Sequence, residues 1–196
     1  YSITKDFKNN MWFCNGVRLH MFDSQTQKIA SFPFKFSITN ILSDPSRNKI
    51  WIASAGDDTN LYSYDYLSKK IDSIETDVSS GFSKTLSLDK DNRIWIGTQK
   101  GLVVFYNAAN IFNESIVDAE PVIILDDGGI PKKLLGDQTI NSIAIDGADN
   151  KWFGTNNGGV IKTNPNGKNT IHNFNTTNSP LPSNTILKIA VDKVSG

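Results

Sequence analysis

Four tryptophans mark an internal repeat, and this repeat limits the fold more than any other feature. Each tryptophan lies in a similar frame, read as KDFKNNMWFCN, SDPSRNKIWIAS, LDKDNRIWIGT and IDGADNKWFGT. An aspartate stands six or seven positions before each tryptophan, and an aliphatic residue three positions before each aspartate. We expect the tryptophans and aliphatic residues to form the core of each repeat; they are Trp12, Trp51, Trp95 and Trp152, with Ile3, Ile41, Leu86 and Ile143.

Each repeat is predicted to form four short antiparallel strands. In the fourth repeat, Ile143 and Ile145 alternate with small residues, which is the period of a β-strand. Polar and glycine-rich turns at 147–150, 156–158 and 165–167 then separate three further strands. Four strands repeated about every 40 to 45 residues are typical of β-propeller blades, which pack face to face. The small residue two positions after each tryptophan fits such close packing.

The sequence therefore predicts an all-β fold, a single partial β-propeller over residues 1–196. We expect blade 1 at about 1–34, blade 2 at 36–78, blade 3 at 82–128 and blade 4 at 139–176. The start of a fifth blade is expected at 184–196, because Ile189 and Asp192 repeat the aliphatic–aspartate spacing. The third repeat carries an insertion over 107–138, with its outer strand expected at 121–125 between two extended loops.

Both ends of the chain fall in the same phase of the repeat, with first strands expected at 2–5 and 186–191. This favours an arc of a larger propeller, although a compact four-bladed ring with an additional strand also fits. An open arc exposes two apolar faces. We therefore expect an isolated arc to form homo-oligomers unless the remaining blades or domains of a parent chain cover those faces.

Composition excludes several kinds of partner. Lysine plus arginine equals aspartate plus glutamate at 20 each, without a basic stripe, so no nucleic-acid partner is expected. No apolar run approaches the length of a membrane span, so no membrane insertion is expected. The first residues do not resemble a signal peptide, which would have been removed or lie outside this sequence. Cys14 is the only cysteine, so no internal disulfide can form.

No catalytic or metal-binding group stands out. Cys14 occupies the small-residue register of the repeat, which favours a packed side chain over a nucleophile. His20 and His172 fall on a third and a fourth strand of different repeats, without spaced ligand partners, so zinc is not expected. The turns at 89–92 and 146–149 hold several carboxylates that could bind calcium, but aspartate is also favoured in turns for its backbone bonds.

The inserted region offers the best candidate for partner contact, because insertions in repeat proteins map to loops on the binding face. Its candidate contact residues are Asp126, Asp127, Lys132 and Lys133. No cofactor is expected, with calcium at the turn 126–129 as the open alternative.

The segments NRIWIGTQKGLVVF and NKWFGTNNGGVIKTN resemble the two-component regulator propeller repeat. The stretch 101–192, with its insertion, is more specifically similar to the propeller of the type IX secretion attachment complex of Bacteroidetes. The resemblance implies a periplasmic, outer-membrane-associated or cell-surface domain that binds a protein or glycan without catalysis. It leaves open a periplasmic ligand-sensing arc of a hybrid two-component regulator, and a propeller enzyme acting on polysaccharide is the alternative of another class.

Overall fold

The computed structural model describes residues 2–55, 61–74, 83–112, 119–126 and 128–192. These residues fall into two compact units. One unit comprises residues 1–77 and 109–118, and the other comprises 78–108 and 119–196. Each unit is built from four-stranded antiparallel sheets whose strands follow one another in chain order.

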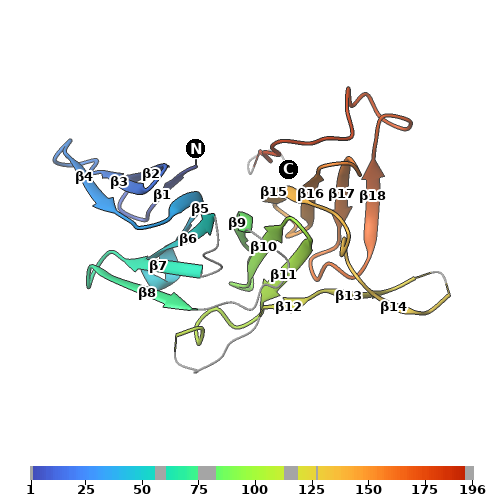
Figure 1. Ribbon diagram of the computed structural model, residues 1–196, viewed down its shortest axis with the longest axis horizontal. Coiled ribbons are helices and arrows are strands. Elements are labelled where there is room, and N and C mark those ends of the chain that lie inside the picture. The colour runs from blue at the N-terminus through green and yellow to red at the C-terminus, as the bar shows by residue number, and fades with distance from the viewer. Residues whose placement is uncertain (1, 56–60, 75–82, 113–118, 127, 193–196) are drawn as a thin grey trace. The chain divides into compact units, whose positions relative to one another are not determined.

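The first unit contains two sheets, drawn in blue to cyan in Figure 1. The first sheet comprises β1 (Ile3–Lys5), β2 (Met11–Asn15), β3 (Arg18–Phe22) and β4 (Ile29–Pro33). The second comprises β5 (Ser37–Asp44), β6 (Lys49–Ala55), β7 (Leu61–Asp65) and β8 (Lys70–Ile74). A single 3-10 turn, η1 (Pro45–Arg47), joins β5 to β6.

The second unit contains two sheets of the same kind and a separate hairpin (Figure 1). The third sheet comprises β9 (Ser83–Leu88), β10 (Ile94–Thr98), β11 (Gly101–Phe105) and β12 (Glu120–Pro121). The fourth comprises β15 (Ile140–Ile145), β16 (Lys151–Thr155), β17 (Val160–Thr163) and β18 (Thr170–Phe174). Between them, β13 (Ile123–Leu125) pairs with β14 (Pro131–Lys133).

Each sheet has two unlike faces, because successive side chains of a strand point to opposite sides. We call the side that carries the tryptophan the tryptophan face and the other side the aliphatic face. In the fourth sheet, Phe153 pairs with Ile143 on the aliphatic face, while Trp152 pairs with Ala144 on the other. The remaining sheets have the same register, with Ile3 opposite Phe13, Ile41 opposite Ile52 and Leu86 opposite Ile96.

Within each unit, the tryptophan face of one sheet packs on the aliphatic face of the next. In the first unit one buried cluster joins Trp12 and Leu19 to Ile41, Ile52 and residues beside them. In the second unit Trp95, Leu102 and Val104 of the third sheet pack with Ile143, Phe153 and Ile161 of the fourth. The repeat in the sequence therefore corresponds to a repeat of the contacts between sheets, in which each tryptophan contributes a large apolar side chain to one side.

The small residue after the tryptophan permits this close approach. A Cβ atom at Gly97 would lie 2.7 Å from Cγ2 of Ile140, the first residue of the next sheet. Cys14 and Ala53 hold the same register in the first unit and are buried. Their burial agrees with the expectation of a packing position.

Three expectations from the sequence are wrong in detail. Ile3 was expected in the core but is 65% exposed. It lies on the aliphatic face of the first sheet, and a residue on that face is buried only where another sheet packs against it. The outer strand expected at 121–125 is divided, with β12 completing the third sheet and β13 turning into the hairpin with β14. The expected fifth-blade strand at 186–191 is not part of a β-ladder, because no neighbouring strand pairs with it among the residues described.

In the described part of the chain, no helix has both the length and the apolar character needed to cross a membrane.

Candidate functional site

The aspartate of every repeat accepts a hydrogen bond from the indole of the same repeat. The Nε1–Oδ2 distances are 2.9 Å from Trp12 to Asp6, 3.0 Å from Trp51 to Asp44, 2.8 Å from Trp95 to Asp89 and 3.0 Å from Trp152 to Asp146. Each bond closes the turn between the first and second strands and fixes the indole over its sheet. The spacing of aspartate and tryptophan is visible in the sequence, but this hydrogen bond was not predicted from it.

The same aspartates also bind the backbone of their turns. Oδ1 of Asp146 accepts the backbone N–H groups of Ala148 and Asn150 at 3.0 and 2.8 Å, and Oδ1 of Asp89 accepts that of Arg93 at 2.9 Å. Burial alone would raise the pKa of Asp146, but hydrogen bonds from Asn150, Trp152 and the turn backbone outweigh it and lower the pKa. These contacts give the turns at 89–92 and 146–149 a structural role in which the carboxylates are engaged by the protein itself.

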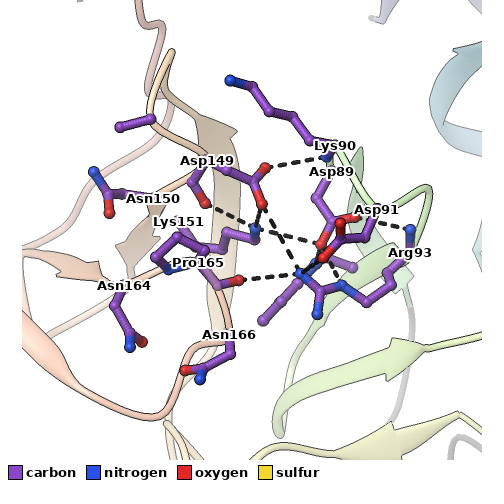
Figure 2. Close-up of polar contacts among 12 residues, drawn as sticks. Asp89, Lys90, Asp91, Arg93, Asp149, Asn150, Lys151, Asn164, Pro165 and Asn166 are labelled. Carbon is purple, nitrogen blue, oxygen red and sulfur yellow. Dashed lines mark hydrogen bonds and ion pairs between the residues drawn. The ribbon is translucent and has the colours of Figure 1, made fainter.

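A cluster of charged residues lies between the third and fourth sheets (Figure 2). Nε of Arg93 lies 2.6 Å from Oδ2 of Asp89, and its Nη2 donates to the carbonyl of Pro165 at 3.3 Å. Across the interface, the backbone N–H of Lys90 donates to Asp149 at 3.1 Å. The cluster therefore ties the turn that precedes β10 to the turn that precedes β16.

Lys151 is the buried centre of this cluster, with a side chain that has no exposed surface. Its Nζ lies 2.8 Å from both the carbonyl and a carboxylate oxygen of Asp149, and 3.3 Å from Oδ2 of Asp89. It also lies 5.2 Å from the ring centroid of Trp95, a cation–π distance. The ammonium thus has a full set of partners, so the cluster acts as an ionic contact between sheets and offers no unsatisfied charge for chemistry.

Burial also tends to raise the pKa of Asp89, but hydrogen bonds from the Trp95 indole and from Arg93, together with the Lys151 charge, lower it. Asp44 behaves similarly in the first unit. There, Ser46, Trp51 and Arg47 lower the pKa of Asp44 against the effect of burial. Both carboxylates are therefore held as anions, which excludes them as proton donors near neutral pH.

Three of the four predicted contact residues belong to the hairpin β13–β14 and the residues beside its strands. Lys132 and Lys133 are exposed on β14, while Asp127 lies outside the described residues. Oδ1 of Asp126 accepts the backbone N–H groups of Gly128 and Ile130, both at 2.9 Å, so this carboxylate shapes the turn. The hairpin also exposes apolar side chains that were not predicted from the sequence, which are Ile123, Leu125 and Ile130.

The base of the hairpin is anchored in the second unit. Val122 and Leu134 are buried in the cluster around Trp95, and the backbone N–H of Leu134 donates to the carbonyl of Val122 at 2.8 Å. Beyond this base, two lysines and apolar side chains share a two-stranded ribbon that belongs to neither four-stranded sheet. Such a combination can contact a partner without disturbing either sheet.

The histidines and the cysteine each have local contacts of their own. Nδ1 of His20, on β3, lies 2.8 Å from the hydroxyl of Ser31, and the ring stacks on Phe13. His172, on β18, packs beside Phe174 in the other unit. Sγ of Cys14 contacts the carbonyl of Ser2 at 3.7 Å. Among the described residues, no group of three or more histidine, cysteine or acidic side chains is arranged to hold a metal ion.

An apolar groove of about 440 Å³ lies on the tryptophan face of the fourth sheet. Trp152, Val160 and Phe174 form its floor, and the segment after β18 forms its wall through Pro180, Leu181 and residues 189–192. The rings of Trp152 and Phe174 are nearly parallel, with centroids 6.1 Å apart. We call this feature the Trp152 groove.

Comparison with known proteins agrees with this repeated architecture. Residues 77–100 match the family model described as two component regulator propeller. The chain is similar in structure to PorZ, described as an essential surface component of the type IX secretion system of Porphyromonas gingivalis. That match has a TM-score of 0.77 and 20% identity, and covers 97% of this chain and 29% of the other. The fold is a β-propeller.

Two further structures show how widely this fold is shared. The extracellular domain of BT4673 from B. thetaiotaomicron, described as part of a hybrid two component system, matches with a TM-score of 0.67 at 20% identity. It covers 98% of this chain and 24% of that one. A protein described as a gluconolactonase, DrR130, matches with a TM-score of 0.62 at 11% identity, over 85% of this chain and 60% of its own. No curated protein sequence matches the chain.

These matches confirm the all-β propeller fold and the resemblance to both repeat families that the sequence indicated. This chain spans less than a third of the PorZ and BT4673 chains that it matches.

Proposed function

We propose that this chain is an arc of a larger β-propeller that acts outside the cytoplasm as a non-catalytic recognition and scaffold domain. Its partner is a protein or a glycan of the cell envelope, and its place is the periplasm, the outer membrane or the cell surface. The similarity to a surface component of type IX secretion supports both the role and the location.

The observation that carries this proposal is the hairpin β13–β14. Leu125 and Ile130 are 67% and 65% exposed, and Lys132 and Lys133 lie exposed beside them. Large apolar side chains that gather in contact with solvent, rimmed by polar groups, are typical of surfaces that bind a partner. The structural aspartates and the buried lysine, by contrast, are already engaged within the protein.

Binding by the hairpin can be measured directly. The chain is immobilised and tested by biolayer interferometry against purified type IX secretion proteins and against bacterial surface polysaccharides. We expect saturable binding to one of these classes. Changing Leu125→Ser, Lys132→Glu and Lys133→Glu together should weaken it by about tenfold or more, since a few exposed anchors carry most interface energy.

The matched control changes Lys28→Glu and Lys35→Glu, two exposed lysines of the first unit. This control alters charge to the same extent and should leave binding unchanged. Equal loss in both variants would assign the effect to net charge, and saturable binding to neither class would contradict the proposal.

A ligand-sensing arc of a hybrid two-component regulator is the second candidate, favoured by the match to the BT4673 extracellular domain. It predicts a small soluble ligand, so an increase in the thermal unfolding temperature with free oligosaccharides, but not with proteins, would support it.

A polysaccharide-active propeller is the candidate of another class, and the match to a protein described as a gluconolactonase keeps it open. Incubation of the chain with the same polysaccharides, followed by chromatography of the products, tests it. Cleavage that depends on the chain would replace the non-catalytic proposal.

A further inference from the structure

The hairpin β13–β14 has two outer edges, and the pairing of its strands shows which main-chain groups each edge presents. The backbone N–H of Leu134 donates to the carbonyl of Val122 at 2.8 Å, and that of Asp126 donates to the carbonyl of Ile130 at 3.0 Å. In an antiparallel ladder, hydrogen-bonded pairs alternate with pairs whose main-chain groups point outward. The residues that point outward by this alternation are Ile123 and Leu125 on β13, and Pro131 and Lys133 on β14.

The outer edge of β14 is poorly suited to pairing with a further strand. Pro131 has no backbone N–H to donate. The carbonyl of Lys133 already accepts the backbone N–H of Gly136 at 3.2 Å. Proline and lysine on a free edge are common means by which proteins prevent the pairing of edge strands. The edge of β14 is therefore protected.

The outer edge of β13 has no such protection. Within the described part of the chain, no hydrogen bond engages the outward N–H and carbonyl groups of Ile123 and Leu125. The side chains of these two residues are 46% and 67% exposed. Residues two positions apart present their donors and acceptors at the spacing that a further strand requires. β13 is thus an open edge flanked by apolar side chains.

The open edge begins beside a hollow at the base of the hairpin. The hollow has a volume of about 500 Å³, and Ile123 forms part of its lining. Tyr106 and Pro121 line it as well, while Glu120 and Lys168 supply charges of both signs. A strand paired with β13 can therefore extend to a hollow that accepts one of its side chains.

This edge lies inside the sequence, between the third and fourth sheets. The contacts between sheets join a tryptophan face to an aliphatic face. Further blades of a larger propeller would pack on such faces of the first and fourth sheets. Neither face includes the edge of β13, which belongs to a separate two-stranded ribbon. Added blades would therefore not take the place of a strand at this edge.

We propose that β13 accepts an extended segment of a partner protein as the third strand of its ribbon. The segment pairs through its main chain with Ile123 and Leu125 and places branched aliphatic or aromatic side chains beside theirs at alternate positions. One further side chain of the segment enters the hollow beside Tyr106. This proposal rests on the proposed function and deepens it, because it specifies a protein partner and main-chain pairing as the mode of contact.

A second copy of this chain fits the edge less well. Two copies of β13 could pair about a two-fold axis, but the strand has only three residues, Ile123–Leu125. Specific protein interfaces bury about 1,200–2,000 Å² in total, far more than two such short strands provide. A longer segment that also fills the hollow has a larger surface to contact.

The probe is a peptide selected from a phage-displayed library of linear heptapeptides against the immobilised full chain. We expect the selected sequences to carry branched aliphatic or aromatic residues at alternate positions. One selected peptide is then synthesised, and its binding to the full chain is measured by isothermal titration calorimetry. N-methylation of each of its backbone N–H groups in turn should weaken binding at alternate positions only, because only alternate N–H groups of an added strand face β13.

Two proline variants test the edge on the chain itself. Leu125→Pro removes an outward N–H that the hairpin does not use, so it should weaken peptide binding by about tenfold or more. Ser31→Pro is the matched control. Ser31 points outward on β4, since the backbone N–H of Asp23 donates to the carbonyl of Lys28 and sets the same alternation. This control should bind the peptide like the unmodified chain.

Binding lost at every N-methylated position, or at none, would overturn the proposal, and this series leaves the chain unmodified should Leu125→Pro fail to fold. Undiminished binding by folded Leu125→Pro, or selection of no peptide, would also overturn it. A dimer that Leu125→Pro dissociates would make a second copy the occupant and overturn it as well. If strand addition fails while Leu125→Ser with Lys132→Glu and Lys133→Glu still weakens partner binding, the recognition function stands and only this mode of contact is wrong.

Discussion

At the scale of single residues, the aspartate–indole hydrogen bond explains why two residue types repeat together. Tryptophan gives each sheet a large apolar surface, and its N–H needs an acceptor once the ring is buried. An aspartate that ends the first strand supplies that acceptor and orders the turn at the same time. The hydrogen bond between aspartate and tryptophan is thus a local interaction that holds the indole in place for its contact with the next sheet.

Asp44→Ala tests this device in the first unit. Asp44 is fully buried and accepts hydrogen bonds from Trp51 at 3.0 Å and from Ser46 and Arg47 at 2.6 Å. Its loss leaves buried donors without a partner and should lower the free energy of unfolding by about 3 kcal/mol. Urea denaturation followed by tryptophan fluorescence measures the change. A double-mutant cycle with Trp51→Phe isolates the indole bond, and strict additivity would contradict it.

Lys151→Ala should lower the free energy of unfolding by about 3 kcal/mol, because a buried ion pair loses one partner. Lys151→Met should cost less, since methionine restores the apolar stem that packs over Trp95. Urea denaturation of both variants gives the comparison. If Lys151→Met lowered the free energy of unfolding as much as Lys151→Ala, packing of the lysine stem over Trp95 would not contribute to stability.

The lowered pKa values of Asp44, Asp89 and Asp146 predict a loss of stability in acid. A carboxyl group whose pKa is lower in the folded chain than in the unfolded chain stabilises the fold. This contribution is present at pH values above the pKa of the unfolded chain, here 3.8. The contribution is lost as the pH falls below about 4 and the unfolded chain takes up protons first. Urea midpoints measured between pH 7 and pH 3 should therefore fall. Asp146→Asn should reduce this dependence.

Residue identity alone predicted some of these roles and missed others. The fixed offset between aspartate and tryptophan was visible in the sequence, and it would have indicated a hydrogen bond had the buried indole been considered. Lys151 could not be assigned in this way, because lysine is usually exposed. The sequence gives one indication that Lys151 is buried. It directly precedes Trp152, and the residues that precede the other three tryptophans are apolar, namely Met11, Ile50 and Ile94.

At the scale of elements, each sheet is an interchangeable unit with one tryptophan face and one aliphatic face. Strand alternation and turn residues predicted the four sheets because those signals are local. The outer strand of the third sheet was misplaced because β12 spans only Glu120–Pro121, too short for alternation to be read. Residues 186–191 were expected to form a strand, but a strand also requires a partner to pair with, and none pairs with them among the residues described.

Gly97→Ala tests the contact between elements. The added Cβ would lie 2.7 Å from Cγ2 of Ile140 on the next sheet and 2.7 Å from Cγ2 of Thr85 on its own sheet, so side chains of both sheets would have to shift. We expect a loss of about 1–3 kcal/mol in the free energy of unfolding, which is typical of overpacking. Gly147→Ala is the matched control, since no atom lies within 4 Å of its added Cβ. Equal effects of the two substitutions, measured by urea denaturation, would show that backbone freedom and not packing is responsible.

At the scale of the whole molecule, the aliphatic face of the first sheet carries large apolar side chains in contact with solvent. Ile3 and Ile29 lie on this face and are 65% and 63% exposed. The sequence could not predict their exposure, because burial of Ile3 depends on a neighbouring sheet and not on its own repeat frame.

We expect the isolated chain to self-associate through this face as its concentration rises. Light scattering over a dilution series should show a molar mass above the 21.7 kDa of one chain. Ile3→Lys combined with Ile29→Lys should restore the monomer, because charges on an apolar sheet face oppose association. Val17→Lys, at an exposed apolar residue in the turn between β2 and β3, is the control. A monomer at every concentration would contradict this expectation.

The hairpin β13–β14 also indicates how such a chain can diverge in evolution. Among the residues that the structure describes, its strands pair only with each other, and its base is closed by the contact between Val122 and Leu134. Residues can therefore be gained or lost at its tip while both flanking sheets keep their hydrogen bonds. Specificity can change there by insertion and deletion, independently of the mutations that the buried interfaces tolerate.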